Sequence, residues 1–525
     1  MTEHRQLVRV VTSAQAAARD ALAIAAGTPS PVLMQRAGAA AAGEIMRRFS
    51  PAPGTRVLVL CGPGNNGGDG WIVAAELARR GLAVDTCEAM AARTPDAIAA
   101  REAAMRPASA RLGQVSLEAL GAAHFEIVID ALLGTGATGV PRGAIAEAVA
   151  AIESLRARGA RVVALDLPTG LDATTGDAQQ VVDAHLTVTF GTIKRGHLVS
   201  RGACGELVVV DIGLGAHAAT GDGAGELVDE SWVAEHVPVI HADAHKGTRR
   251  KIAIVGGAEG MSGAAILAAR SAMRSGAGMV KVFADTASLD AVRCAEPAAM
   301  TAPWPVDSAA VARDVASWAD AIAIGPGLGQ SDRARTMLEG LLRDWRGPVV
   351  LDADALNIFA GRLGALAALL DHRAAILTPH AAEFARLAGC PVADVLASRF
   401  EIGQRVADRL GAVVLLKGTP TVVFTPGAHA PRVSASGTPA LATAGSGDVL
   451  TGIAVTLLAQ MHDAADAAAC AAWVHGRAAE LAQFAEARRD ARGVVLDDVL
   501  HSLPEAWRFR AAPPPAPVLV ELPAV

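Results

Sequence analysis

Short apolar runs alternate with longer stretches rich in Ala, Leu and Arg along most of the chain. Examples are RVLVL at residues 56–60 and EIVID at residues 126–130, and further runs in the first half cover residues 161–166, 185–190 and 206–211. Strand-like runs separated by helix-length stretches are typical of βαβ units and a parallel sheet. The pattern therefore predicts the α/β fold class.

The alternation stops between Gly213 and Gly225, where Gly and Ala dominate, and then starts again. Runs of the second series cover residues 251–257, 279–284, 321–327, 348–354, 374–380 and 412–418. An interruption of this kind marks a connection between domains. We predict one domain over residues 1–220, a second over residues 221–510, and a Pro-rich tail over residues 511–525 that cannot hold a helix and frays.

Composition narrows the class of partner. Of the 525 residues, 52% are hydrophobic and 19% are charged, which is enough apolar material for two large packed domains. The net charge is −6 and no run of five Lys or Arg residues occurs, so we expect small-molecule partners and neither nucleic acid nor membrane. The six cysteines form no CxxC pair, and neither a signal-peptide pattern nor a run of roughly 18 apolar residues is present. These features predict a cytoplasmic protein.

The segment ATAGSGDVLTG at residues 442–452 carries the strongest chemical signal. Gly445, Ser446 and Gly447 precede a helical pattern, so their amides would lie at a helix N-terminus and attract an anion. Asp448 follows on the first turn, where its carboxylate can accept a proton from a substrate hydroxyl. The segment therefore predicts phosphoryl transfer from ATP or ADP. The alternative is a plain Gly-rich turn with an acidic cap.

Polar or Gly-rich residues also end four of the strand-like runs upstream. Lys417 and Gly418 end one run, at the position where open α/β sheets bind ligands, and Lys417 can neutralise phosphate. His380 and Glu383 follow another, and Glu383 can hold Mg²⁺ through water. Taken alone, Glu383 is more simply explained as a charge on the first turn of a helix. The other two runs end in IAIGPGLGQ at residues 322–330 and LDADALN at residues 351–357.

These motifs, in this order, resemble the ribokinase superfamily over about residues 240 to 505. The block HKGTRRKIAIVGGAEGMSGAAILAARSAMRSGAG at residues 245–278, which sugar kinases of the superfamily lack, looks specifically like the ADP/ATP-dependent NAD(P)H-hydrate dehydratases. The resemblance implies phosphorylation of the C6 hydroxyl of the hydrated dinucleotide, followed by elimination of phosphate. It implies that the hydrated dinucleotide contacts Ala264, Gly327, His380 and Asp448. It implies that the adenine nucleotide contacts Lys417, Gly418, Thr419, Pro420, Thr421, Gly445, Ser446 and Gly447.

A second Gly-rich segment, CGPGNNGGDGW at residues 61–71, directly follows the run RVLVL. Its glycines satisfy the G-x-G-x-x-G pattern, and Asp85 lies about 20 residues further on, so a dinucleotide dehydrogenase is one interpretation. Asn65, Asn66 and Asp69 argue against it, because they put polar side chains into a loop that a pyrophosphate-binding turn fills with small residues. The side chain of Asn66 can supply a hard oxygen ligand to a cation.

Two further strand-like runs of the first half end in oxygen-bearing side chains. Asp130 ends one of them, and Asp166, Thr169 and Gly170 follow the other. For either Asp alone, capping of the loop after a buried strand is an equally good explanation. With the segment at residues 61–71, they predict a cluster of oxygen ligands at one edge of the sheet.

Together with SPVLMQRAG at residues 30–38, these motifs look like the NAD(P)H-hydrate epimerases over about residues 10 to 215. The resemblance implies a Rossmann-like three-layer α/β/α domain, with Asn66, Asp130 and Thr169 as ligands of K⁺. It implies a substrate site formed by Asn65, Asn66, Gly67, Gly68, Asp69, Gly134, Thr135, Gly136, Ala137, Thr138, Gly139, Val140 and Asp166. We expect Asp166 to be the acid/base, because epimerisation at C6 requires proton movement. Some epimerases carry a Lys in the loop after Asp130, whereas here the nearest cation along the sequence is Arg142.

The order of the two halves resembles the bifunctional NAD(P)H-hydrate repair enzymes. It implies that the first half interconverts the R and S hydrates and that the second, ribokinase-like half dehydrates the S hydrate with ADP, or with ATP, and Mg²⁺. The reaction would convert ADP to AMP and phosphate. One alternative is an ATP-dependent vitamin or sugar kinase fused to a Rossmann-like module, and another is a dinucleotide sensor that catalyses nothing. The sequence does not decide whether the chain forms a homo-oligomer, which monovalent ion it binds, or whether it uses ADP or ATP.

Overall fold

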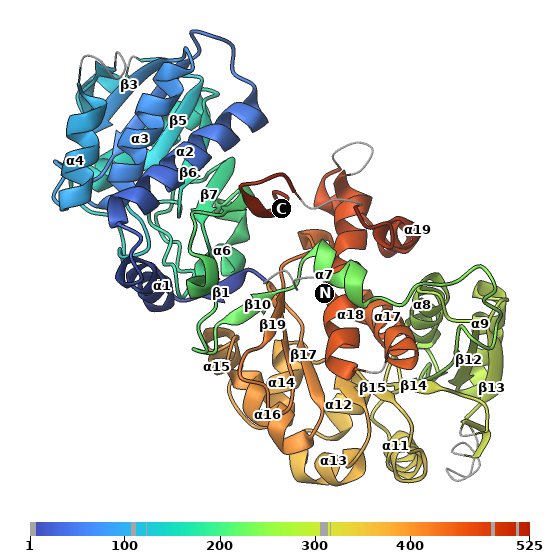
Figure 1. The fold of residues 1–525 in the computed structure, drawn as a ribbon. Helices are drawn as coiled ribbons and strands as arrows, with labels where there is room; N and C mark the ends of the chain where they lie inside the picture. Colours follow the sequence, from blue (N-terminus) through green and yellow to red (C-terminus); the bar gives the residue numbers. More distant parts are fainter. Residues whose placement is uncertain are drawn as a thin grey trace. The chain divides into compact units, whose positions relative to one another are not determined.

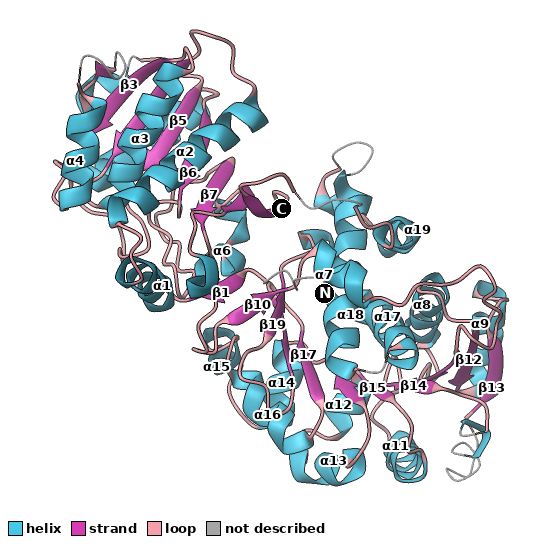
Figure 2. Ribbon diagram, viewed as in Figure 1, coloured by secondary structure: helices cyan, strands magenta, loops and turns pink. Residues whose placement is uncertain are grey.

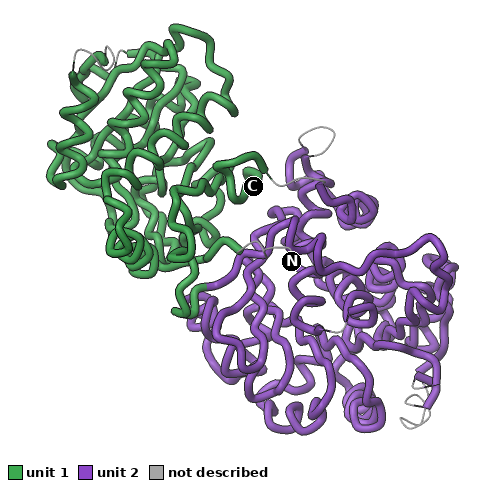
Figure 3. Tube along the Cα trace, in the orientation of Figure 1, with its two compact units in different colours: residues 1–224, 512–525 green, residues 225–511 purple. Residues whose placement is uncertain are grey.

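The computed structural model describes residues 7–106, 112–121, 123–304, 313–315, 317–461, 463–484, 489–510 and 514–525. The chain divides into two compact units (Figure 3). Unit 1 consists of residues 1–224 and 512–525, and unit 2 consists of residues 225–511. In each unit the strands lie among helices (Figure 2), so the predicted α/β class is confirmed.

Unit 1 is built on an eight-stranded sheet with the order β20-β9-β7-β6-β5-β2-β3-β4. All neighbours pair in parallel except β20 and β9. The strands are β2 (Arg56–Cys61), β3 (Ala83–Glu88), β4 (Gly113–Gln114), β5 (Ile127–Ala131), β6 (Arg161–Leu165), β7 (Leu186–Phe190), β9 (Glu206–Val210) and β20 (Val518–Leu522). A short parallel pair is formed by β1 (Arg9–Val11) and β8 (Ile193–Lys194).

Both faces of the unit 1 sheet are covered by helices (Figure 1). Side chains alternate between the faces of a strand, so Val57 and Val59 of β2 join one hydrophobic cluster while Leu58 and Leu60 join another. The first cluster packs against α2 (Ser30–Phe49), α3 (Asn65–Arg79) and α4 (Pro95–Ala104), and the second packs against α5 (Ala144–Ala157). The expected three-layer α/β/α arrangement is confirmed. The remaining helices are α1 (Ser13–Ala25) and α6 (Arg195–Val199).

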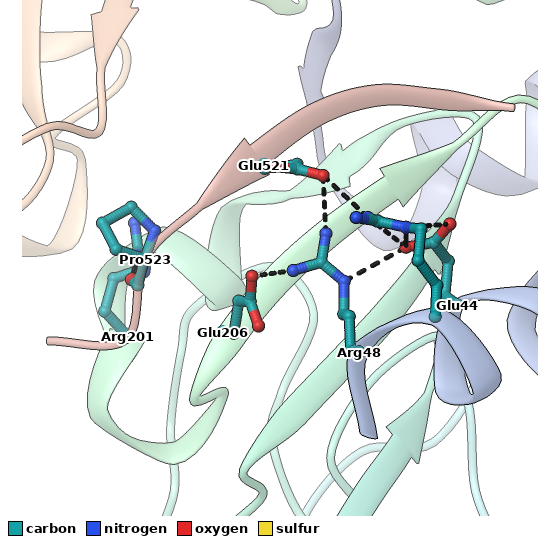
Figure 4. Close-up of polar contacts among 7 residues, drawn as sticks. Glu44, Arg48, Arg201, Glu206, Glu521 and Pro523 are labelled. Atoms are coloured by element: carbon teal, nitrogen blue, oxygen red, sulfur yellow. Dashed lines mark hydrogen bonds and ion pairs between the residues drawn. The ribbon is translucent and has the colours of Figure 1, made fainter. Parts of the chain in front are cut away.

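The C-terminal segment pairs with the sheet of unit 1, so the expectation that it frays is wrong for residues 518–522. Val518 and Val520 alternate inward and are each 4% exposed. The prolines of the tail precede this strand or follow it, so none removes a donor from its hydrogen-bonded ladder. Glu521 accepts hydrogen bonds from Arg47 (2.8 Å) and Arg48 (2.7 Å), and Arg48 also pairs with Glu44 and Glu206 (Figure 4). Residues 511–513 of the predicted tail lie outside the described residues.

Unit 2 contains the strand order β13-β12-β11-β14-β15-β16-β17-β18-β19-β10. From β13 to β17 all pairs are parallel, β18 runs antiparallel to both of its neighbours, and β10 pairs in parallel with β19. The strands are β10 (Gly225–Leu227), β11 (Lys251–Val255), β12 (Met279–Ala284), β13 (Met300–Pro303), β14 (Ala321–Ile324), β15 (Val349–Leu351), β16 (Ala375–Leu377), β17 (Val413–Leu416), β18 (Thr421–Phe424) and β19 (Arg432–Ser434).

One face of this sheet packs against an Ala-rich helical layer formed by α8 (Ser262–Arg274), α17 (Ser446–Gln460), α18 (Ala464–Phe484) and α19 (Leu496–Ala506). Helices α17 and α18 are apolar around most of their circumference, which matches their burial on several sides. A Cβ at Gly452 would lie 2.2 Å from the carbonyl oxygen of Ala268, so this glycine lets α17 approach α8.

The opposite side of the strands carries several of the other helices (Figure 1). The remaining helices are α7 (Glu230–His236), α9 (Leu289–Ala295), α11 (Asp332–Asp344), α12 (Asp354–Ile358), α13 (Leu363–Leu370), α14 (Ala381–Ala388), α15 (Val392–Ala397) and α16 (Ile402–Leu410). Among the described helices of both units, none is long and apolar enough to cross a bilayer.

Candidate functional sites

A cavity of about 640 Å³ opens in unit 1 near the carboxyl ends of its parallel strands, where such sheets bind ligands. The structure brings together in its lining many of the residues predicted for the substrate site, namely Asn65, Asn66, Asp69, Gly134, Thr135, Gly136, Ala137 and Asp166. Thr138, Gly139 and Val140 are exposed on the same loop and do not line the cavity. Their contact with substrate stays a prediction.

The polar residues of NNGGD suggested a loop, but the segment is the start of α3. Gly64 is extended immediately before the helix, and the helix then begins at Asn65. A Cβ at Gly67 would lie 2.0 Å from the carbonyl oxygen of Gly62, and one at Gly68 would lie 2.7 Å from the side chain of Met34. The two glycines therefore allow close packing at the start of the helix, while Asn65, Asn66 and Asp69 face the cavity.

The predicted cation ligands belong to one hydrogen-bonded group. Asp130 is fully buried and accepts hydrogen bonds from the hydroxyl (2.7 Å) and the amide (2.7 Å) of Thr169. Thr169 in turn accepts a hydrogen bond from the Leu133 amide, and Asn66 donates to the Leu133 carbonyl. The Oδ1 atom of Asn66 is buried without a hydrogen-bond partner. A buried carbonyl oxygen without a donor has its lone pairs free for a cation.

Lys194 is the positively charged side chain that lines this cavity, and it was not identified from the sequence. It lies in β8, is 3% exposed, and its Nζ contacts the Asp166 carboxylate while donating to the Thr189 hydroxyl (2.8 Å). Arg142, the nearest cation along the sequence, does not line the cavity. The sequence shows it only as a single Lys in TFGTIKRGH, just after a strand-like run, and does not show that it is buried.

The environment of Asp166 holds its carboxylate in the ionised form. Burial by itself raises the pKa of this group, but the adjacent Lys194 ammonium outweighs burial and lowers the pKa below its usual value. Asp166 has a φ of 61°, a left-handed conformation that costs free energy for a residue other than glycine. The ring of His197 lies 2.9 Å from the Asp166 carbonyl oxygen, and burial lowers the pKa of that His to about 3.

In unit 2 the Gly-rich segment lies at a helix N-terminus, as predicted. Gly445 takes a left-handed φ of 91°, α17 begins at Ser446, and Asp448 is on the first turn. A Cβ at Gly447 would lie 3.1 Å from Nζ of Lys417, so the absence of a side chain leaves room for the ammonium group. The free amides of a helix start and a lysine ammonium therefore lie together, which suits a phosphate group.

Lys417 is part of a buried charge network. Its Nζ lies 2.8 Å from Oδ1 of Asp352 and 3.8 Å from Oε2 of Glu383. The other oxygen of Asp352 accepts a hydrogen bond of 2.7 Å from Thr451. Asp352 and Thr451 were not identified from the sequence, because the motif LDADALN offers two acidic candidates and Thr451 is one of many helical hydroxyls.

The pKa of Asp448 is raised to about 7. Burial is the largest cause, the negative charge of Asp352 adds to it, and the Lys417 ammonium opposes it. Burial also tends to lower the pKa of Lys417, but Asp352 and Glu383 outweigh burial and raise it. Asp448 thus titrates near neutral pH, where a carboxylate is a more effective general base than at its usual pKa.

His380 and Glu383 cap α14. The His380 ring accepts a hydrogen bond from the Ala382 amide, and Glu383 accepts one of 2.8 Å from the His380 amide. This is the structural role that the sequence left open for Glu383. The Glu383 carboxylate is nevertheless 6% exposed and lies beside Lys417, so it faces the charge network and not solvent.

The other predicted contacts of unit 2 fall into two groups. A Cβ at Gly327 would lie 3.2 Å from the Cβ of Ala264, so these two residues adjoin each other. The turn from Gly418 to Thr421 is held by Arg399, which donates to the Pro420 carbonyl (3.2 Å), and Thr421 donates to the Gly418 carbonyl (3.1 Å). Thr419 lies within this turn, which directly follows Lys417.

Comparisons with known proteins match each of the two units to a family of its own. Residues 252–503 match the family described as NAD(P)H-hydrate dehydratase, and residues 30–196 match that described as YjeF-related protein N-terminus. The bifunctional NAD(P)H-hydrate repair enzyme Nnr of Moorella thermoacetica is 36% identical over 91% of this chain and 93% of its own length. The enzyme of the same name from Salinibacter ruber is 38% identical over 92% of this chain and 93% of its own.

One solved structure is similar to part of the chain. The ADP/ATP-dependent NAD(P)H-hydrate dehydratase of Bacillus subtilis, co-crystallised with ATP and Mg²⁺, is 30% identical, covers 53% of this chain and 96% of its own, and has a TM-score of 0.46.

Proposed function

Because the chain belongs to the family of bifunctional NAD(P)H-hydrate repair enzymes, we propose that it restores hydrated NADH and NADPH through two activities. Unit 1 interconverts the R and S hydrates, and unit 2 dehydrates the S hydrate at the expense of ADP. The observation that carries the proposal is the position of Asp448 beside Lys417 at the start of α17, in a chain that also holds the unit 1 cavity.

In unit 2, Asp448 acts as the general base. Its carboxylate takes the proton of the C6 hydroxyl, and the hydroxyl oxygen then attacks the terminal phosphoryl group of ADP, releasing AMP. The amides of Gly445, Ser446 and Gly447 and the Lys417 ammonium stabilise the charge on the phosphoryl group as it transfers. The C6–O bond then breaks with its electrons on phosphate, the C5 proton passes to water, and the C5=C6 double bond of NAD(P)H forms.

A divalent cation fits the same place. Mg²⁺ bound there would neutralise the negative charge of the phosphate groups. Glu383, whose buried carboxylate lies beside Lys417, is the residue we expect to hold it through water. The use of Mg²⁺, though not the choice of Glu383, agrees with the co-crystallisation of the Bacillus subtilis dehydratase with ATP and Mg²⁺.

The cation proposed for unit 1 is K⁺. Asn66 offers an unpartnered carbonyl oxygen, and Asp130 and Thr169 offer a carboxylate and a hydroxyl from the same hydrogen-bonded group. The described residues contain no cluster of three or more His, Cys, Asp or Glu side chains arranged to hold a metal. A single carboxylate with neutral oxygens suits a monovalent ion better than a divalent one.

The test of the proposal is repair of a mixture of the two hydrates of NADPH by the full chain with ADP and Mg²⁺. Recovery of dihydronicotinamide absorbance from both epimers, together with formation of one AMP for each NADPH, is expected. Asp448→Asn should abolish recovery, while Asp85→Asn, a substitution on β3 away from both sites, should leave it unchanged. Accumulation of a stable phosphorylated product, or no recovery by the wild-type chain, would overturn the proposal.

A further inference from the structure

The unit 1 cavity contains more acidic side chains than the proposed epimerase reaction uses so far. Three carboxyl groups line it, Asp20 from α1, Asp69 from α3 and Asp166 after β6, together with one lysine, Lys194 from β8. Asp20 lies outside the range that matches the family of the N-terminal half, residues 30–196. One lysine cannot pair closely with three carboxylates, so the three groups have different electrostatic environments.

Lys194 is committed to Asp166. Its ammonium group contacts the Asp166 carboxylate, and the Thr189 hydroxyl bonds to both of them. The ring of His197 faces the backbone oxygen of Asp166, and with a pKa of about 3 it is neutral at physiological pH. Asp166 is therefore ionised, and the one lysine that lines the cavity pairs with it and not with Asp69 or Asp20.

The environment of Asp69 is the opposite of that of Asp166. It is 9% exposed, it lines the cavity, and within the described part of the chain its carboxyl group makes no hydrogen bond or ion pair. Burial raises the pKa of Asp69 well above its usual value, and the negative charges of Asp166 and Asp20 raise it further, while Lys194 opposes them.

Among the described residues, Lys194 is the only Lys or Arg that lines the cavity. Charged groups on the elements that pack against α3 are engaged elsewhere: Asp130 with Thr169, Asp96 with Ser30, Arg36 with the carbonyl of Ile212, and Arg101 with Glu88. Met34 of α2, which lies against Gly68, contributes only apolar surface. Asp69 therefore holds its proton more firmly than an ordinary carboxyl group, and it opens into the same cavity as the ionised Asp166.

Inversion at C6 needs both an acid and a base. The C6–O bond breaks with its electron pair on oxygen, an acid supplies a proton to that oxygen, and water leaves behind an iminium ion between N1 and C6. Water then adds to the opposite face of C6, and a base takes up the proton that it loses. The net change is inversion at one carbon, with no oxidant, reductant or other reactant.

We propose that Asp69 is a second catalytic residue of the epimerase site, the acid that protonates the departing C6 hydroxyl while Asp166 accepts the proton of the incoming water. The inference rests on the proposed epimerase function and goes beyond it by pairing two carboxyl groups with opposite roles. Asp20 assists from α1, where its charge favours the neutral form of Asp69. That helix is held to the cavity by Ser13, which donates to the Thr135 carbonyl (2.5 Å).

The substitution Asp69→Asn tests the proposal, because it keeps the size of the side chain and removes the transferable proton. In the full chain with K⁺, we expect the epimerase kcat to fall by about 100-fold or more with little change in KM, in line with loss of a general acid. Dehydratase activity on the pure S hydrate should be unchanged, which reports the integrity of the same molecule. Asp85→Asn is the matched control, since Asp85 lies on β3 and pairs with Arg56 away from the cavity.

A second readout separates catalysis from structure. The wild-type epimerase should lose activity at high pH as Asp69 ionises, and Asp69→Asn should lack this alkaline limb in its residual activity. Asp20→Asn removes a neighbouring negative charge and should move the alkaline limb to lower pH while keeping most of the rate.

Two results would overturn the inference: an Asp69→Asn epimerase within about threefold of wild type, and a slow Asp69→Asn enzyme that keeps the alkaline limb. Absence of epimerase activity in the wild-type chain would instead contradict the proposed function of unit 1.

Discussion

The ammonium group of Lys417 lies 2.8 Å from the carboxylate of Asp352, and Asp352 is 1% exposed. The two residues follow β17 and β15, strands that are separated by β16 in the sheet. Their pairing fixes the position of the lysine beside Gly447 and places a second negative charge near Asp448. The network thus fixes the position of the lysine at the phosphate site and raises the pKa of Asp448, the expected base.

The dehydratase should depend on pH through Asp448. The base works only when ionised, and burial, followed by the charge of Asp352, raises its pKa to about 7, so kcat/KM should fall as the pH drops below about 7. Asp352→Asn removes the neighbouring charge and should shift this limb to lower pH. The measurement is the pH profile on the S hydrate with ADP. A limb near the ordinary pKa of a carboxyl group in the wild type would contradict the assignment.

Replacing Lys417 should damage stability as well as activity. Lys417→Met leaves the Asp352 carboxylate buried and unpaired, which costs about 3–5 kcal/mol of unfolding free energy. The double variant Lys417→Met with Asp352→Asn should recover most of that stability and none of the dehydratase activity. Denaturant unfolding of each variant, followed by circular dichroism, gives the comparison. Equal stability of the single variant and wild type would show that the pair is unimportant to the fold.

Unit 1 activity should require a monovalent cation. Exchange of K⁺ for a large organic cation is expected to suppress epimerisation, while the dehydratase retains its rate on the S hydrate. Asn66→Leu removes the unpartnered oxygen and should raise the K⁺ concentration for half-maximal epimerase rate by about tenfold, equivalent to about 1.4 kcal/mol of binding free energy. The same K⁺ dependence in Asn66→Leu as in wild type would exclude this oxygen as a ligand.

The C-terminal strand should stabilise unit 1. A chain that ends at Pro517 exposes the edge of β9 and loses the burial of Val518 and Val520, which costs about 3 kcal/mol. Its epimerase should denature at lower urea concentration, with the dehydratase unaffected. Glu521→Gln is the milder control, because a partly exposed ion pair contributes about 1 kcal/mol or less. An unchanged urea midpoint for the truncated chain would show that the strand adds nothing.

The sequence predicted those features that lie within a single strand end or helix start. The position of Asp448 at the start of α17 and that of Asp166 after β6 follow from a local pattern of apolar runs, glycines and polar residues. Lys194 and Asp20 could not be found in this way, because tertiary packing brings them to the cavity from other elements of the chain. Asp352 does lie at a predicted strand end, but the sequence does not distinguish it from Asp354. The pairing of β20 with β9 joins segments about 300 residues apart in sequence, and strand propensity depends on such partners.

The most direct test of two coupled activities uses the pure R hydrate of NADPH with ADP, Mg²⁺ and K⁺. The wild-type chain should convert all of it to NADPH. Asp166→Asn should leave the R hydrate unconverted beyond the enzyme-free rate yet consume the S hydrate normally, and Asp448→Asn should interconvert the hydrates without forming NADPH. Full conversion of the R hydrate by Asp166→Asn, or NADPH formation by Asp448→Asn at the wild-type rate, would contradict the account.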